Sequence, residues 1–231
     1  MENRGEYVIV YMDLLGTTSK IKSQNSEEAL KSIKNIYEQS VQLFTKNLAE
    51  EKIQVKVFSD NIILAKETTA NVPPIAPGVL EMISFAAAFQ MIAMLHGWSI
   101  RGGITVGELY IDDIFVWGKG LLKAYELEDK IAINPRIIID PQIIPSIAVR
   151  VKPDIIPNVK FDGGFLVVDY LSLTHDKNTL ERIRKVILNL LRQANTNDLI
   201  KGKADWLRTN FNEYCETHDF KDITIDPKDE I

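Results

Sequence analysis

The hydrophobic pattern of the first part of the chain predicts a strand, a helix and a strand hairpin. Residues 7–12 form a continuous β-branched and aromatic run, which is typical of a strand buried on both faces. Apolar residues recur at helical spacing over 26–48, after a serine that suits a helix N-terminus. Residues 53–58 alternate like a strand, and the turn residues 59–61 lead into a further strand over 62–65.

The pattern that follows extends this arrangement to a complete small sheet. After a proline-punctuated loop we expect, in order, a helix over 79–96, strand-like runs over 99–106 and 109–116, a helix over 121–130 and a short strand over 136–139. The order strand, helix, strand, strand, helix, strand is the βαββαβ order of a ferredoxin-like sheet, not the βαβαβ order of a Rossmann domain. The sequence therefore predicts an α+β domain over residues 1–140.

Residues 141–231 read as an elaboration packed on the same domain. The segment 141–164 contains four prolines and is expected to be an irregular connector. A strand over 165–170 and amphipathic helices over 179–194 and 198–218 follow it. We therefore expect a C-terminal helical elaboration on the βαββαβ domain.

Composition narrows the class of protein. The chain has 231 residues and a formal net charge of -5, with acidic and basic residues interleaved, which disfavours a nucleic-acid partner and a membrane-surface role. Cys215 is the single cysteine, so we expect a reducing compartment and a structural thiol. The segment 1–6 lacks the apolar region of a signal peptide, and the apolar stretch 82–95 is too short and too interrupted to span a bilayer. These features predict a cytoplasmic protein.

Two aspartates stand where the predicted topology brings strand ends together. In a βαββαβ sheet the first and third strands are antiparallel neighbours, so Asp13 at the end of one should lie beside Asp60 in the turn that begins the other. Singly, each aspartate is more often a turn former or a helix cap. As a pair, close carboxylates repel unless a hard divalent cation such as Mg²⁺ or Mn²⁺ binds them. We therefore interpret Asp13 and Asp60 as a metal site.

Other residues could complete such a site. Gly16, Thr17 and Thr18 follow the first strand and offer backbone N–H groups to phosphate oxygens. The available cations are Arg101 and Lys119 or Lys123, and for each a surface ion pair or a solvated helix start is at least as common a role. The three histidines, His96, His175 and His218, show no ligand spacing.

These motifs resemble those of the class III nucleotidyl cyclase family. The segment 13–18, Asp-Leu-Leu-Gly-Thr-Thr, resembles the family's first metal motif, Asp-Ile-x-Gly-Phe-Thr. Ser59-Asp60 is similar to its Gly-Asp turn, and the segment 115–118, Phe-Val-Trp-Gly, to its Asp-Val-Trp-Gly segment. The resemblance implies two metal ions held by Asp13, Asp60 and the backbone carbonyl of Leu14. It also implies a head-to-tail homodimer with the sites at the interface.

The chain departs from the family at positions that matter for activity. Lys56 matches the adenine-reading lysine of adenylyl cyclases, but Phe115 stands where the family has an adenine-reading aspartate. Leu122 and Glu126 stand where the family has its transition-state asparagine and arginine. Arg101 or a lysine such as Lys119 would then have to supply the missing positive charge.

The whole set looks most like the bacterial pyrimidine cyclases of Pycsar antiphage defence. The features are the segments 13–16, 58–60, 101–104 and 124–128, with Pro135-Arg136 and the C-terminal Lys203-x-x-Trp206-Leu207 followed by Asn210. The resemblance implies conversion of UTP to 3′,5′-cyclic UMP, or of CTP to cyclic CMP, as a signal to a separate effector. A degenerate nucleotide-binding domain and a polymerase-like palm remain as alternatives, and the net charge of -5 disfavours the palm.

Lys56 and Phe115 favour UTP among these substrates. A lysine only donates hydrogen bonds, and uracil presents a carbonyl oxygen where cytosine and adenine present an amino group. Phe115 could pack flat against a small pyrimidine. Lys56 could instead point to solvent, and Asp112 or Asp113 could accept from cytosine and restore CTP binding.

Overall fold

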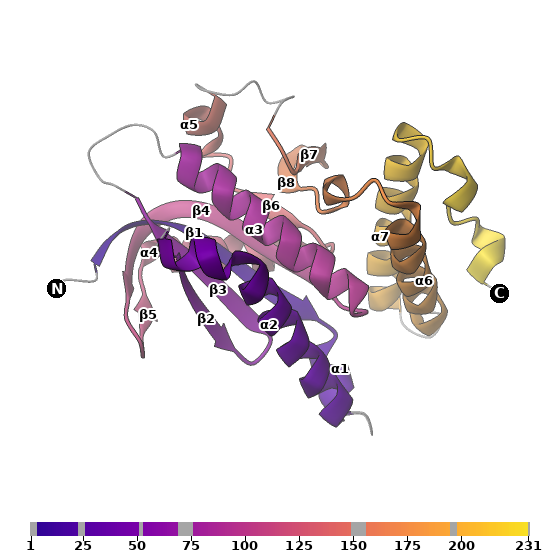
Figure 1. The fold of residues 1–231 in the computed structure, drawn as a ribbon, viewed down its shortest axis with the longest axis horizontal. Coiled ribbons are helices and arrows are strands. Elements are labelled where there is room, and N and C mark those ends of the chain that lie inside the picture. The colour runs from indigo at the N-terminus through magenta and orange to yellow at the C-terminus, as the bar shows by residue number, and fades with distance from the viewer. Residues whose placement is uncertain are drawn as a thin grey trace.

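The computed structural model describes residues 4–22, 26–50, 53–68, 76–148, 156–194 and 198–230. Within these ranges, the side chains of residues 18–19, 43–50, 76–77, 148, 198–199 and 230 lie outside the description. Figure 1 shows a twisted sheet covered by helices, with a separate pair of helices toward the C-terminus.

The described strands form an eight-stranded sheet centred on β1 (Arg4–Leu15). β1 pairs antiparallel with β3 (Asn61–Glu67) on one side and with β4 (Ser99–Ile111) on the other. The full order is β2-β3-β1-β4-β6-β8-β7, with β5 paired to β4. The remaining strands are β2 (Ile53–Phe58), β5 (Val116–Trp117), β6 (Ile137–Ile139), β7 (Val159–Asp162) and β8 (Phe165–Val168). The order β2-β3-β1-β4 is the ferredoxin-like order, so the predicted α+β fold is confirmed.

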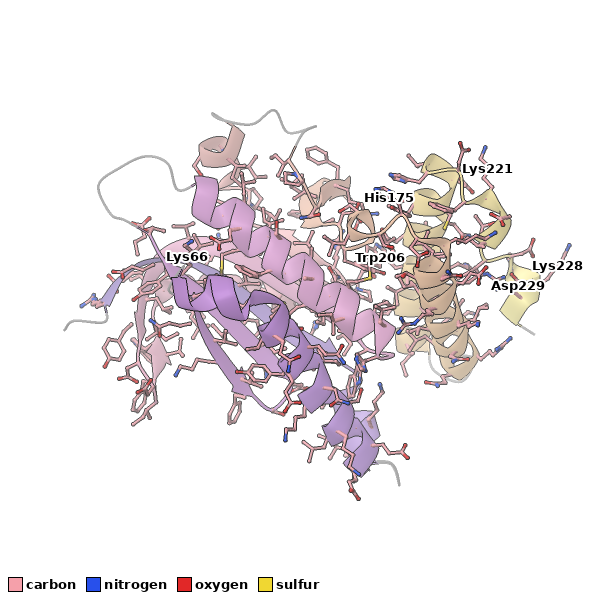
Figure 2. All side chains as sticks on the ribbon, viewed as in Figure 1. Lys66, His175, Trp206, Lys221, Lys228 and Asp229 are labelled. Carbon is pink, nitrogen blue, oxygen red and sulfur yellow. The ribbon has the colours of Figure 1, made fainter. Side chains whose placement is uncertain are left out.

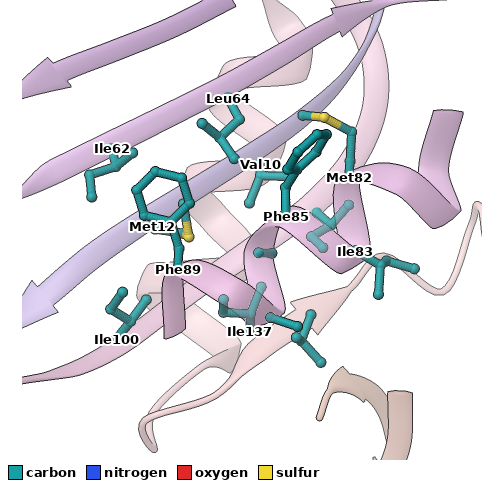
Figure 3. Close-up of a cluster of buried hydrophobic side chains, with 14 of the residues drawn as sticks. Val10, Met12, Ile62, Leu64, Met82, Ile83, Phe85, Phe89, Ile100 and Ile137 are labelled. Atoms are coloured by element: carbon teal, nitrogen blue, oxygen red, sulfur yellow. The ribbon is translucent and has the colours of Figure 1, made fainter. Parts of the chain in front are cut away.

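Side chains of β1 alternate between the two faces of the sheet. One face, with Val10 and Met12, packs against Phe85 and Phe89 of helix α3 (Ala76–Leu95), which lies beside α2 (Ser26–Glu50) (Figure 3). The other face, with Tyr7 and Ile9, packs against helix α4 (Lys119–Glu126). A single π-helical turn, η1 (Leu127–Ile131), continues α4. Because Asp13 is odd-numbered like Tyr7 and Ile9, it belongs to the α4 face of the sheet.

Helix α3 is the core helix of the protein. Its segment Gly78–Leu95 is long and apolar enough to cross a membrane by length and composition alone, with a mean hydropathy of 1.7. However, 61% of that segment is buried inside the protein. The apolar character of α3 is therefore explained by the sheet and helices packed around it.

The C-terminal helices form a second core on the end of α3. Helices α6 (Lys177–Ala194) and α7 (Asp198–Thr217) pack on each other and on Met91 and Met94 of α3. Short 3-10 turns accompany them at η3 (Leu171–Leu173), η4 (Lys221–Ile223) and η5 (Pro227–Glu230). Cys215 is free and buried in this core. Both helices were expected from the sequence, whereas the boundary at residue 140 stays a prediction.

The structure corrects the sequence prediction at three places. A short helix, α1 (Thr17–Lys22), was not predicted. The expected connector contains α5 (Ile144–Ala148) and β7, which pairs with β8. The two strand-like runs over 99–106 and 109–116 are a single long strand, β4, followed by the short β5.

Gly107, which lies between the two predicted runs, is not a turn residue. A Cβ at this position would lie 2.9 Å from the Cα of Gly120. The glycine pair therefore lets α4 approach β4 closely, and the strand runs through this contact without a break.

Candidate active site

Strand register brings Asp13 and Asp60 to the same end of the sheet. Asp13 lies opposite Asn61 of β3, and Asp60 belongs to the turn just before that strand. The backbone N–H of Leu14 donates a hydrogen bond of 3.0 Å to the Asp60 carbonyl. The Asn61 amide contacts Asp60 Oδ1 at 3.4 Å, and Tyr11 donates its hydroxyl hydrogen to Asn61 Oδ1. The two aspartates are therefore neighbours, as the topology argument predicts.

The loop after β1 makes the turn expected of a small-residue segment. Gly16 has φ +87°, a left-handed conformation, and there is open space where a Cβ would stand. Thr17 is buried, and its hydroxyl donates to the Leu14 carbonyl at 2.8 Å. The Thr17 side chain therefore holds the turn together, so only its backbone remains available to a phosphate. The side chain of Thr18 lies outside the described part of the structure.

Arg101 stands between two carboxylates. It lies opposite Asp13 in the β1–β4 register, and its Nε donates to Asp13 Oδ2 at 3.2 Å. The same Nε lies 2.6 Å from Glu128 Oε1. That second contact lacks hydrogen-bond geometry, since Glu128 Oε1 has no hydrogen-bond partner among the described residues. The contact with Glu128 is therefore mainly an electrostatic one.

Burial sets the charge state of this cluster. Burial raises the pKa of Asp13, the positive charge of Arg101 opposes this rise, and the negative charge of Asp60 adds to it. Burial also raises the pKa of Glu128 to about 7. Arg101 again opposes the rise, and Asp13 adds to it. The cluster thus holds more carboxylates than Arg101 neutralises, and an added cation at Asp13 and Asp60 would relieve the repulsion.

The chemistry of the donor atoms at Asp13 and Asp60 fits a hard divalent cation. Carboxylate and carbonyl oxygens are the ligands that Mg²⁺ and Mn²⁺ prefer. Among the described residues, no group of three His, Cys, Asp or Glu side chains is placed to hold a metal ion. Asp13, Asp60 and the Leu14 carbonyl would therefore supply only part of a ligand set, and oxygen atoms of another molecule would have to complete it.

The residues predicted to read the base come from two elements, and the charge of Lys56 acts on Asp112, which lies in the same turn as Phe115. Lys56 is half-buried on β2, and Phe115 stands in the β4–β5 turn with 64% of its surface exposed. Hydrogen bonds from Tyr110 and from the Phe115 and Ile114 N–H groups lower the pKa of Asp112, and the nearby charge of Lys56 lowers it further. The Asp112 carboxylate is thus engaged in its own turn.

Lys119 makes no described contact with the aspartates, although the cavity that it lines reaches Tyr11 on the strand of Asp13. It lines an open cavity of about 610 Å³ together with Trp117, Leu122 and Tyr125, in front of α4. Glu126 pairs with Lys130 at 2.7 Å on the exposed face of the same helix. Lys123 lies 3.9 Å from Asp140. Neither Lys119 nor Lys123 makes a described contact with Asp13.

Two residues of the cluster were not predicted as site residues, although both belong to segments that resemble the Pycsar cyclases. Glu128 reaches Arg101 from the π-helical turn after α4, and Lys203 reaches the cluster from α7. The helical spacing of the sequence predicts only an exposed polar position for Glu128. For Lys203 the sequence does contain a signal, because it is a charged residue within the apolar repeat of the last helix.

Comparison with known proteins agrees with this geometry at the level of fold. No family model and no curated protein matches the chain. Among solved structures, the adenylyl cyclase CyaB from P. aeruginosa has a TM-score of 0.52 at 15% identity, over 72% of this chain and 95% of that chain. The catalytic core of a rhodopsin-guanylyl cyclase with converted specificity, in complex with ATPalphaS, has a TM-score of 0.52 at 13% identity, over 73% and 99%.

A third solved structure gives a similar result. The guanylate cyclase domain of RhGC from Catenaria anguillulae, in complex with GTP, has a TM-score of 0.50 at 11% identity, over 71% of this chain and 93% of that chain. The chain therefore has the fold of class III adenylyl and guanylyl cyclase domains.

Proposed function

We propose that this protein is a metal-dependent nucleotide cyclase that converts UTP to 3′,5′-cyclic UMP and pyrophosphate. The observation that carries the proposal is the pairing of Asp13 with Asp60 at one end of a cyclase-fold sheet. The complexes of similar domains with ATPalphaS and with GTP support a nucleoside triphosphate as the class of substrate. The Pycsar resemblance supports a role of the product as a signal in antiphage defence, read by a separate effector.

The reaction is an intramolecular displacement in which the ribose 3′-oxygen attacks the α-phosphate and pyrophosphate leaves. Asp13, Asp60 and the Leu14 carbonyl would hold two divalent ions, Mg²⁺ or Mn²⁺, and these ions would stabilise negative charge on the phosphate oxygens and on the 3′-oxygen. Asp13 or Asp60 accepts the proton of the 3′-hydroxyl. Arg101 orients Asp13 through the 3.2 Å hydrogen bond and favours its ionised form. The open backbone turn at Gly16 receives phosphate oxygens.

The preference for UTP rests on the edge formed by Lys56 and the β4–β5 turn. Lys56 donates to a uracil carbonyl oxygen, whereas it would meet an amino group in cytosine. Asp112 is held by hydrogen bonds within its turn, which argues against its service as an acceptor for cytosine. CTP remains the alternative substrate, because Asp113 is exposed on the same turn.

The active form is proposed to be a homodimer with its sites at the interface. Large apolar side chains are exposed at the end of β2, in the β4–β5 turn, on β5 and on α4: Phe58, Ile114, Phe115, Trp117 and Leu122. Trp117 and Leu122 line the same open cavity, so this surface suits a second copy of the chain.

A non-catalytic nucleotide-binding domain is the second candidate. Leu122 is apolar and Glu126 is acidic, so these positions supply no transition-state cation in a monomer or in a dimer. This candidate predicts nucleotide binding without product.

The test is incubation with each nucleoside triphosphate and Mn²⁺, followed by mass spectrometry. We expect cyclic UMP and pyrophosphate from the wild-type protein. Asp60→Ala and Asp13→Asn should each lower the rate of cyclisation by several orders of magnitude, while the circular dichroism spectrum stays unchanged. Full activity of a folded Asp60→Ala protein would refute the two-metal proposal, and oligonucleotide product would indicate a polymerase instead.

A further inference from the structure

One charged residue stands on the buried face of the last long helix. The face of α7 that packs on the protein carries Ala204, Leu207, Phe211 and Tyr214, spaced three or four residues apart. Lys203 lies at the start of this face and is half-buried. A lysine in such a position loses hydration, and burial accordingly lowers its pKa.

Specific contacts fix the position of α7 and therefore of Lys203. Trp206 donates its indole N–H to Asp162 of β7 at 3.2 Å, and Figure 2 shows Trp206 on the side of the helix pair toward the sheet. One and two turns farther along, Lys160 pairs with Asn210, and the Tyr214 hydroxyl donates to the Thr174 carbonyl at 2.6 Å. The helix is thus anchored along the face that carries Lys203.

Lys203 borders a cavity at the catalytic end of the sheet. The cavity has a volume of about 260 Å³ and lies between the ends of β1 and α3 and the two C-terminal helices. Lys20, Gly16, Ser99 and Gln193 supply its polar lining. Apolar residues form most of the remaining wall: Leu15, Leu190, Ile200, Ala204 and Leu207.

Both lysines of this cavity are desolvated. Lys20 donates to the Gly97 carbonyl at 3.2 Å and lies 3.5 Å from the centre of the Trp98 ring, and burial lowers its pKa to about 8. Lys203 makes no ion pair or hydrogen bond within the part of the chain that the structure describes. Instead its ammonium lies near the Asp13, Glu128 and Arg101 cluster and interacts with all three at longer range. A protein gains little stability from such a placement, so a ligand is the better explanation.

We propose that Lys203 binds the β- and γ-phosphates of the nucleotide, at the mouth of the cavity beside Gly16. This inference rests on the proposed function and adds a residue to it. Three features indicate a polyphosphate anion: the two ammonium groups, the open backbone turn at Gly16, and the proximity of Lys203 to Asp13. Leu122 and Glu126 replace the asparagine and arginine of the family. In this proposal the C-terminal helix α7 supplies positive charge to the site instead.

The competing explanation is that Lys203 only balances the charges of Asp13 and Glu128. The two explanations differ in the free protein. A balancing lysine should lower the melting temperature when removed, whereas a lysine held for an absent anion should leave it unchanged or raise it, because its burial has a cost.

The experiment measures binding of inorganic tripolyphosphate to the full chain by calorimetry in magnesium buffer. The variants are Lys203→Ala, Lys203→Arg and, as a matched control, Lys201→Ala, whose side chain is exposed on the same helix. We expect binding to weaken at least about tenfold in Lys203→Ala, to recover within a few-fold in Lys203→Arg, and to stay unchanged in Lys201→Ala. For UTP, KM should rise by a similar factor.

The outcomes separate this inference from the proposed function. Equal tripolyphosphate affinity in Lys203→Ala and Lys201→Ala, or a lowered melting temperature without loss of binding, would overturn the role of Lys203. A tenfold loss of binding in a protein that forms no cyclic nucleotide from any triphosphate would support the anion site and overturn the cyclase proposal.

Discussion

Glu128 should make the stability of the metal-free protein fall as pH rises. Its pKa is about 7 in the folded protein against 4.5 for an ordinary glutamate, because burial disfavours the charged form. The folded state therefore holds a proton that the unfolded state has already released, so unfolding becomes easier as pH rises through this range. Between pH 5.5 and pH 8 this group should remove about 2 kcal/mol from the free energy of unfolding, at about 1.4 kcal/mol per pKa unit of difference.

Urea unfolding with a chelator present, at several pH values, measures this effect. Glu128→Gln should lose this part of the pH dependence, because the amide does not ionise. Glu126→Gln is the matched control: that carboxyl lies two residues away, is exposed, and has its pKa lowered by Lys130. Asp13 contributes to the slope of both proteins in the same direction. Parallel pH profiles for the wild type and Glu128→Gln would show that the burial argument is wrong.

Three further changes test other parts of the structure. Gly103→Ala places a Cβ 2.5 Å from the Ala124 carbonyl oxygen, so thermal unfolding should show a loss of at least about 1–3 kcal/mol; an unchanged melting temperature would contradict the packing of α4 on β4. Trp117→Glu should convert a dimer to a monomer in analytical ultracentrifugation, and a persistent dimer would exclude this surface. Lys56→Ala should reduce the preference for UTP over CTP by about tenfold in competition assays, and an unchanged ratio would exclude Lys56 from base selection.

The neighbourhood of Asp13 and Asp60 was predictable because it follows from strand order alone. Once residues 7–12 and 62–65 are taken as antiparallel neighbours, the end of the first strand must lie beside the start of the other, so Asp13 and Asp60 must be close. The order of predicted elements gave the ferredoxin-like sheet, and apolar periodicity gave the C-terminal helices. Their boundaries followed from apolar periodicity.

The surroundings of Arg101 were not predictable in this way. Glu128 meets Arg101 through a π-helical turn, and a single inserted turn has no signature in the spacing of apolar residues. Lys203 comes from a helix about a hundred residues farther along the chain, so only tertiary packing reveals it. Gly107 lies between the two predicted strand runs because α4 packs closely on β4 there, and the sequence alone does not distinguish such a contact from a turn.

Strand β6 pairs with a strand on each side, and this pairing limits where the chain can be truncated. β6 is a run of three buried isoleucines, parallel to β4 and antiparallel to β8. A chain cut after Asp140 would lose β8, and β6 would become an apolar edge strand with free backbone donors and acceptors. Such edges recruit strands from other molecules, so the shortened chain should aggregate on expression. The C-terminal part thus protects this edge of the sheet from association with other molecules.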